Sequence, residues 1–252
     1  MFAPPLTIPL LEQKAYDEPS EFTPENLLRE ARRQKSLGSG AVPDVCVPDP
    51  DGDLVAYLRT HRTAERHSDW ACYHTRLYTT EWEGLSFGVV GQAVGASFAV
   101  LVAEQLFASG CRLLISPTSA GQITPVLPPP YGLLIEWAIR DEGTSYHYLP
   151  PGVESQFHPS LLEQLRGAFA DCPVPVVTGD SWTTDAPYRE TRRAIEHHRL
   201  QGILAVEMEA AALYAFASDR DRRVVCFALV TNQMAQIEGD FEKCPLPLRV
   251  GQ

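Results

Sequence analysis

The chain lacks the long apolar runs and the basic clusters that would point to a membrane or a nucleic acid. None of its 252 residues belongs to an apolar run of about 18 or more, so no membrane-spanning helix is expected. The formal net charge is −11 and the pI is about 5.1, whereas non-specific binding to nucleic acid needs Lys and Arg to neutralise phosphates. These two partner classes are excluded, but a small anion in a locally basic pocket is compatible with the composition.

Paired cysteines and a targeting segment are also missing. The six cysteines are scattered, without a Cys-x-x-Cys pair or the Cys/His spacing of a metal site, which favours reduced thiols. The stretch Met1–Pro5 has no charged segment followed by an apolar core, so no signal peptide is expected. We therefore expect a protein of the reducing cytoplasm, with no metal site.

Strand-like and helix-like patterns alternate along most of the chain, without a repeat or a dividing linker. Thr23 before Pro24 and Glu25 is a typical helix start. The alternation predicts one α/β domain over residues 1–252, a three-layer α/β/α sandwich, preceded by an extended, proline-rich arm at 1–21. Strands are predicted at 42–47, 71–82, 85–90, 112–116, 174–178, 202–206 and 224–230, and helices at 23–35, 54–63, 96–107, 159–170, 188–199 and 209–220. The apolar segment 131–139 fits either a strand or a helix by its pattern.

Two carboxylates flank a methionine in Glu207-Met208-Glu209, between an apolar run and an alanine-rich run. In an extended strand, residues two apart point to the same side, so both carboxylates are expected to face one pocket. A carboxylate accepts strong, charge-assisted hydrogen bonds from neighbouring hydroxyls. The segment predicts a clamp for a ribose. The alternative is a strand end with two solvated charges.

Several polar or glycine-rich segments follow predicted strands. In open α/β sheets, ligands bind beyond the carboxyl ends of the strands, so these segments are the candidate site loops. Gly91, in Gly91-x-x-x-Gly95, is a candidate phosphate contact, with close helix–strand packing as the alternative. The segments are Gly91–Gly95, Ser116–Gln122, Gly179–Tyr188, Val206–Glu209 and Val230–Gln233.

Three blocks of sequence resemble one family. They are Arg140-Asp-Glu-Gly-Thr-Ser-Tyr-His-Tyr-Leu-Pro-Pro151, Thr178-Gly-Asp-Ser-Trp-Thr-Thr-Asp-Ala-Pro-Tyr-Arg-Glu-Thr191 and Val206-Glu-Met-Glu-Ala-Ala-Ala-Leu213. In this order they resemble the nucleoside phosphorylases, which include purine nucleoside and uridine phosphorylases, from about residue 22 to about residue 233. The resemblance implies a mixed, partly barrel-like central sheet and a homo-oligomer, either a dimer or a trimer of dimers. It also implies a pentosyltransferase that uses inorganic phosphate as co-substrate and no cofactor.

The resemblance also implies roles for individual positions. Met208 and Glu209 are expected to contact the ribose, and Glu207 to shape the same site. The remaining substrate and phosphate contacts are expected at Thr118, Ser119, Ala120 and Gly121 of the small-residue segment, and at Pro187 and Tyr188 beside the base.

The chain departs from the family pattern where phosphate is bound. Ser116 stands where the family usually has an arginine, and Asp-Pro-Asp-Gly-Asp at 49–53 stands where the family has Gly-Asp-Pro-x-Arg. Acidic side chains there would repel phosphate. The nucleoside half of the predicted site therefore follows the family more closely than the phosphate half.

Two further positions complete the catalytic candidates, which are Glu209, Asn232 and Asp185. Asn232 stands where purine-specific members carry an acidic residue; an amide hydrogen-bonds a base but cannot act as a general acid. This favours a uridine-phosphorylase-like mode, although Asn232 is equally suited to a strand-end cap. Asp185 is the remaining pocket carboxylate, with a helix cap as the alternative.

The sequence thus predicts a nucleoside phosphorylase that cleaves the N-glycosidic bond of a uridine-like or purine nucleoside. The products would be the free base and ribose 1-phosphate. Two alternatives stay open because the expected arginines are missing: a nucleoside hydrolase that uses water, and a non-catalytic nucleoside-binding subunit.

Overall fold

The computed structural model describes residues 8–61, 63–165 and 167–233. Strands and helices alternate along this part of the chain. The helices are α1 (Pro24–Lys35), α2 (Asp53–Thr60), α3 (Ala96–Ala108), α4 (Pro159–Leu165), α5 (Arg192–Leu200) and α6 (Ala210–Arg220), with short 3-10 turns η1 (Pro9–Leu11), η2 (Ser145–His147) and η3 (Pro187–Arg189).

All the strands of the described chain join one mixed sheet in the order β10-β6-β8-β9-β5-β1-β4-β3-β2, with β7 added beside β6. A further pairing of β10 with β5 closes the first five strands into a barrel. The predicted mixed, partly barrel-like α/β fold is confirmed. The strands are β1 (Val45–Asp49), β2 (Ala64–Arg66), β3 (Leu77–Trp82), β4 (Leu85–Gly91), β5 (Leu113–Gln122), β6 (Tyr131–Asp141), β7 (Glu154–Gln156), β8 (Val176–Thr184), β9 (Ala205–Glu207) and β10 (Val224–Asn232).

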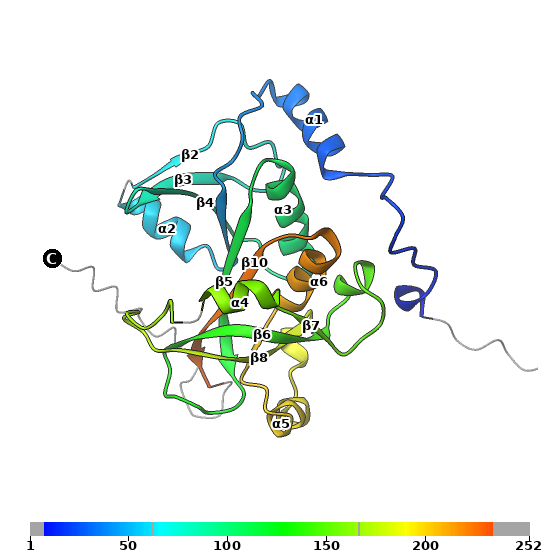
Figure 1. Ribbon diagram of the computed structural model, residues 1–252, viewed down its shortest axis with the longest axis vertical. Helices are drawn as coiled ribbons and strands as arrows, with labels where there is room; N and C mark the ends of the chain where they lie inside the picture. Colours follow the sequence, from blue (N-terminus) through cyan, green and yellow to red (C-terminus); the bar gives the residue numbers. More distant parts are fainter. Residues whose placement is uncertain (1–7, 62, 166, 234–252) are drawn as a thin grey trace, which may run out of the picture.

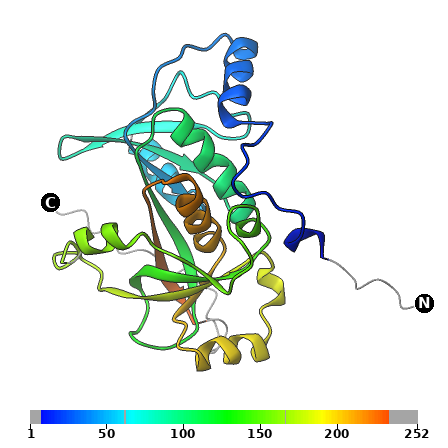
Figure 2. The ribbon, with the colours of Figure 1, turned by 45° about the vertical axis from the view of Figure 1, so that its right-hand side comes forward.

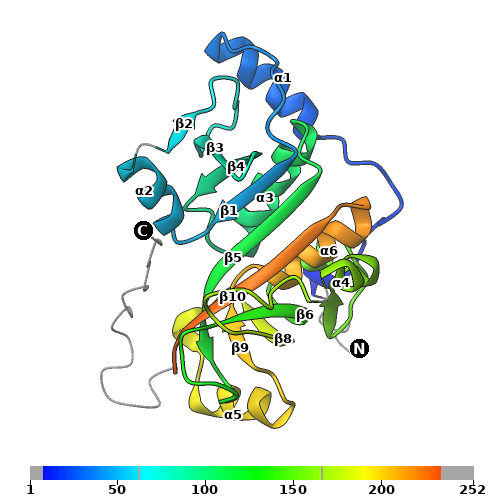
Figure 3. The same ribbon diagram turned by 60° about the vertical axis from the view of Figure 1, so that its left-hand side comes forward.

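Helices cover both sides of the sheet. Figures 1 to 3 show α2 on one side of β1 and β4, and α3 with α6 on the other. Helix α6 is buried almost all round, because every residue from Ala210 to Ala217 is shielded from solvent. Its alanines allow close approach to the sheet and to α3, and this core fixes the α6 N-terminus, where the candidate site lies.

The predicted helices at 23–35 and 96–107 agree with the structure, and the capping chemistry explains the first of them. Thr23 accepts a hydrogen bond from the Asn26 backbone N–H, Pro24 opens the first turn, and Ser36 ends α1 in the left-handed conformation. Local signals of this kind are sufficient where no other part of the chain competes.

Long-range pairing corrects several predicted boundaries. The segment after Ser116 is predicted as a site loop, but β5 continues to Gln122, because Pro117–Ala120 pair with β10 and Gly121–Gln122 with β9. Pairing on both sides overrides the turn preference of these small residues. In the same way, β8 extends to Thr184, β10 to Asn232 and β1 to Asp49.

Several predicted elements are shorter than expected, among them three whose ends moved by four residues or more. Strand β3 begins only at Leu77, and α4 ends at Leu165. Helix α5 begins at Arg192 rather than at 188, because the Thr191 side chain accepts a hydrogen bond from the Ala194 N–H and so caps the helix there.

The described part of the N-terminal arm lies against its own chain. The Tyr16 hydroxyl donates to the backbone oxygen of Tyr146 at 3.2 Å, and Lys14 Nζ lies 3.0 Å from His147 Nδ1. The arm thus contacts η2, inside one of the three family-like blocks.

Two composition-based expectations can be compared with the described chain. None of its helices is long and apolar enough to cross a bilayer. Its five cysteines are free, four of them buried and Cys172 exposed, while Cys244 lies outside the described residues.

Candidate functional site

Glu209 is a buried carboxylate held by two separate elements. It is 2% exposed, and it accepts hydrogen bonds from the Gly95 N–H at 2.7 Å and from the Thr118 hydroxyl at 2.9 Å. Burial, followed by the neighbouring charge of Glu207, raises the pKa of Glu209 to about 7. Because an ionised carboxylate has about four acceptor positions, the group still has acceptor capacity for hydroxyls of a ligand.

Glu207 has a different role from Glu209 in the fold. Its Oε2 accepts the backbone N–H groups of Glu209 and Ala210, each at 2.7 Å. Its Oε1 accepts the hydroxyls of Ser181, at 3.0 Å, and of Thr183. A carboxylate at a helix N-terminus satisfies unpaired N–H groups and favours the helix dipole. Glu207 therefore anchors the start of α6.

The expectation that both carboxylates project from one strand is wrong. Strand β9 ends at Glu207, and Glu209, with φ −130° and ψ −38°, is the N-cap residue of α6. The alternation of an extended strand does not continue past Glu207. Glu209 instead points to the β5 strand and to the turn before α3, whereas Glu207 points back to β8 and to α6 itself.

The small-residue segment lies beside Glu209, within strand β5. Thr118 bonds Glu209 directly, and Ala120 is buried. Gly121 is opposite Val206 on one side and Asn232 on the other. The barrel thus brings together Thr118–Gly121, the Glu207–Glu209 segment and Asn232, which the sequence predicted as parts of one site.

The acidic loop after β1 is closely tied to this segment. The buried Asp49 accepts the Val55 N–H at 3.0 Å through Oδ2, which holds the first turn of α2, and burial raises its pKa. Asp51 Oδ1 accepts the Ser119 hydroxyl at 3.2 Å. A carboxylate therefore stands beside the hydroxyl that was expected to meet phosphate.

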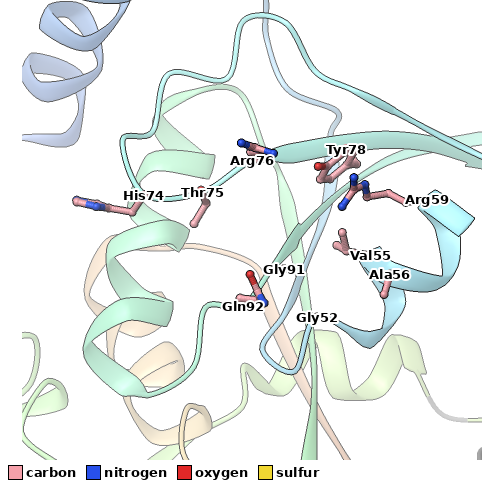
Figure 4. A pocket seen from close by; sticks show the side chains of 10 residues that line it. All are labelled: Gly52, Val55, Ala56, Arg59, His74, Thr75, Arg76, Tyr78, Gly91 and Gln92. Carbon is pink, nitrogen blue, oxygen red and sulfur yellow. The ribbon is translucent and has the colours of Figure 1, made fainter.

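A cavity of about 420 Å³ lies next to this loop (Figure 4). Gly52, the residue before α2, and Gly91, the last residue of β4, form part of its wall. Arg59 of α2 and Arg76, just before β3, bring two guanidinium groups to it. Its remaining lining residues are Val55, Ala56, His74, Thr75, Tyr78 and Gln92.

The segment after β8 is more exposed. Asp185 accepts the Gly143 N–H at 2.8 Å and so links its loop to the turn after β6, rather than capping a helix. Pro187 is half-buried in η3, and Tyr188 is 100% exposed. The Tyr188 ring therefore packs against none of the described residues, and its predicted contact with a base stays a prediction.

The first family-like block forms a loop that is held by hydrogen bonds to three buried residues, Arg140, Glu142 and Ser145. Arg140 donates to the Ser145 hydroxyl at 2.8 Å and to the backbone oxygens of Pro150 and Leu149 at 2.8 and 3.1 Å. Glu142 Oε2 accepts the N–H groups of Thr144 and Ser145. These contacts hold the loop that Asp185 reaches.

Sequence reasoning missed two features of the site. The Gly95 N–H was not singled out as a partner of Glu209, although glycine before α3, at φ +87°, was a signal for an unusual backbone at that place. Arg59 and Arg76 belong to no motif, and only the fold brings them together. Among the described residues, no group of three or more His, Cys, Asp or Glu could hold a metal ion.

Comparison with known proteins identifies relatives over most of the chain. The sequence pattern of the phosphorylase superfamily matches residues 44–243. A guanosine phosphorylase from Halorubrum lacusprofundi is 22% identical over 198 residues, which cover 77% of this chain and 73% of that protein. A purine nucleoside phosphorylase from Plasmodium vivax is 22% identical over 173 residues, which cover 67% and 71%, respectively.

Solved structures show the same fold. The chain is similar to uridine phosphorylase from Vibrio fischeri ES114 in complex with 6-hydroxy-1-naphthoic acid, with a TM-score of 0.66 and 20% identity, covering 81% of this chain and 82% of that one. A second structure of that uridine phosphorylase gives a TM-score of 0.64 at 20% identity, covering 78% and 80%.

Proposed function

Because the chain belongs to the phosphorylase superfamily, we propose that it cleaves the N-glycosidic bond of a nucleoside with inorganic phosphate. The bond between the anomeric carbon and the base nitrogen breaks, and a bond from that carbon to a phosphate oxygen forms. The base departs with the bonding electron pair and takes up a proton. The products are the free base and ribose 1-phosphate.

The observation that carries this proposal is the placement of Glu209. Its carboxylate is fixed by Gly95 and Thr118 at the junction of β5, the turn before α3 and the start of α6. Charge-assisted hydrogen bonds from ribose hydroxyls to this group would hold the sugar while positive charge develops at the anomeric carbon. Met208 is half-buried beside it and would pack on the sugar.

The base is proposed to lie towards the barrel end formed by Gly121 and Asn232, which are neighbours in the sheet. The Asn232 amide would hydrogen-bond the base without acting as a general acid. Relatives named for guanosine, purine nucleosides and uridine all resemble the chain. For this reason the proposal covers both a uridine-like and a purine base.

A second candidate function is hydrolysis of the same bond by water. One contact favours it: the Asp51 carboxylate beside the Ser119 hydroxyl places negative charge where phosphate was expected. Like charges disfavour binding of an anion there.

The test is base release from a panel of uridine, inosine, guanosine and adenosine, each with and without phosphate. Phosphorolysis predicts release that depends on phosphate, whereas hydrolysis predicts equal release in its absence. No turnover of any nucleoside in either condition would contradict both, and would leave a nucleoside-binding subunit.

We also propose that residues 1–252 act as one domain in the cytoplasm and assemble into a homo-oligomer. The fully exposed Tyr188 supports the assembly, since a neighbouring protomer would cover its ring. Analytical ultracentrifugation tests it, and a monomer at micromolar concentration would contradict it.

A further inference from the structure

The cavity next to the acidic loop concentrates positive charge in an acidic chain. The protein has a formal net charge of −11, yet Arg59 and Arg76 both line this one cavity. No Asp or Glu is among its lining residues in the described part of the chain. In Figure 4 the two arginines come from different elements, above Gln92 at the end of β4, while His74 points away from them.

Neither guanidinium is neutralised by another described residue. Between described residues, neither Arg59 nor Arg76 forms an ion pair or a side-chain hydrogen bond. Arg59 lies over the Tyr78 ring, with its Cζ 5.4 Å from the ring centroid, which orients the group without satisfying its N–H donors. An oxyanion would satisfy those donors and relieve the repulsion between the two cations.

The wall of the cavity is closely packed at its two glycines. Gly52 has φ +79°, and a Cβ at this position would lie 2.9 Å from Gln92 Cγ. A Cβ on Gly91 would lie 3.1 Å from Val55 Cγ2. Gln92 has φ +67°, and its backbone N–H donates to the backbone oxygen of Asp49 at 2.8 Å. A non-glycine residue held in this conformation stores strain of the kind that gathers at ligand sites.

The acidic side chains of the neighbouring loop are engaged elsewhere. Asp49 caps α2 through Val55, Asp51 accepts the Ser119 hydroxyl, and Asp53 also has a partner. The arginines therefore determine the sign of charge inside the cavity.

From these observations we infer that Arg59 and Arg76 bind a phosphate group in this cavity. The phosphate group is either inorganic phosphate or the phosphate monoester of a nucleotide. Arginine is the residue suited to bidentate contact with phosphate oxygens. The side-chain amide of Gln92, which also lines the cavity, adds a neutral donor. The turn from Gly91 to Gly95 joins the cavity wall to the residue that holds Glu209. The inference rests on the proposed function for its link to catalysis; the binding itself does not depend on it.

The inference is tested with Arg59→Gln, Arg76→Gln and the double variant. Arg112→Gln is the matched control, because Arg112 is exposed and pairs with Asp44 at the opposite end of β5. Calorimetry measures binding of inorganic phosphate in one arm and of uridine or guanosine 5′-monophosphate in the other. Loss of one charged hydrogen-bonding group is expected to weaken binding about tenfold or more, while the control binds as the wild type does.

The two arms identify the source of the phosphate group. Binding of inorganic phosphate that both variants weaken assigns a co-substrate site; binding of the monophosphate alone assigns a nucleotide site. The inference is overturned if the wild type binds neither probe, or if both single variants and the double variant bind as the wild type does. Circular dichroism of each variant verifies the fold.

Failure of this inference is distinguishable from failure of the proposed function. Phosphate-dependent nucleoside cleavage with an unchanged phosphate KM in the double variant would overturn the inference and leave the function intact. If the wild type binds phosphate, the variants abolish this binding, and the protein cleaves no nucleoside, the inference stands and the proposed function is overturned.

Discussion

The Thr118 hydroxyl donates a hydrogen bond of 2.9 Å to Oε2 of Glu209, a residue 91 positions later in the chain. This contact joins the middle of β5 to the first residue before α6, so the barrel and the helix position the carboxylate together. Glu209 is the group on which the proposed binding of ribose depends, and the hydroxyl stabilises its ionised form.

The first prediction removes this donor with little change of shape. Thr118→Val is expected to raise the pKa of Glu209 and to lower kcat/KM for the nucleoside about tenfold, since one hydrogen bond to a charged group is lost. Thr118→Ser keeps the hydroxyl and should retain most of the activity. Equal losses in the two variants would show that packing of the methyl group matters, and not the hydrogen bond.

The second prediction concerns the anchoring role of Glu207. The Glu207 carboxylate accepts hydrogen bonds from two hydroxyls and two backbone N–H groups. Glu207→Gln replaces one carboxylate oxygen by an NH₂ group, which cannot accept from these donors, and is expected to lower the free energy of unfolding by about 2 kcal/mol. Urea denaturation measures this change, and Glu154→Gln on the exposed position of β7 is the control. A variant with unchanged stability but no nucleoside binding would instead place Glu207 in direct contact with the ligand.

The third prediction is that the ionisation of Glu209 makes both the stability and the activity of the protein depend on pH. The pKa of Glu209 is raised from 4.5 to about 7, mainly by burial, so folding disfavours its ionised form. The stability that this group contributes is complete below pH about 4.5 and is lost as the pH rises through about 7. Activity should rise over the same range, because the ionised carboxylate is the better hydroxyl acceptor.

Glu209→Gln tests the origin of this dependence. The fall of the melting temperature between pH 4.5 and 8 should be smaller in the variant. The remaining dependence comes from other carboxyls whose pKa burial also raises, such as Glu207, Glu190 and Asp49. An identical slope in wild type and variant would contradict the assignment to Glu209.

The fourth prediction concerns the acidic loop. Asp51→Asn removes a negative charge beside Ser119 while keeping an acceptor for its hydroxyl. The phosphate KM should fall about three- to tenfold, as expected for the loss of one nearby like charge at a protein surface. Asp44→Asn, on the exposed end of the sheet, is the control. An increase in the phosphate KM of Asp51→Asn would mean that the carboxylate assists phosphate binding.

The sequence was sufficient for the features that depend on neighbouring residues. The cap at Thr23, the alternation of strands and helices and the Glu207–Glu209 segment were all recognised from local patterns. It was insufficient where distant segments pair. The small-residue segment looks like a turn until β10 and β9 are placed beside it.

The same distinction applies to charge. The acidic residues at 49–53 form one contiguous motif, whereas Arg59 and Arg76 are 17 positions apart and belong to no motif. Only the packing of α2 beside the start of β3 brings both arginines to one cavity. The missing family arginines therefore do not leave this region without cations.

The stoichiometry of the reaction decides between phosphorolysis and hydrolysis. Wild-type protein and Glu209→Ala are incubated with uridine or guanosine and phosphate, and the free base and ribose 1-phosphate are quantified by chromatography and ³¹P NMR. The account predicts equal amounts of both products in the wild type and a loss of about 10²-fold or more in the variant. Free ribose in place of ribose 1-phosphate, or full activity of Glu209→Ala, would contradict it.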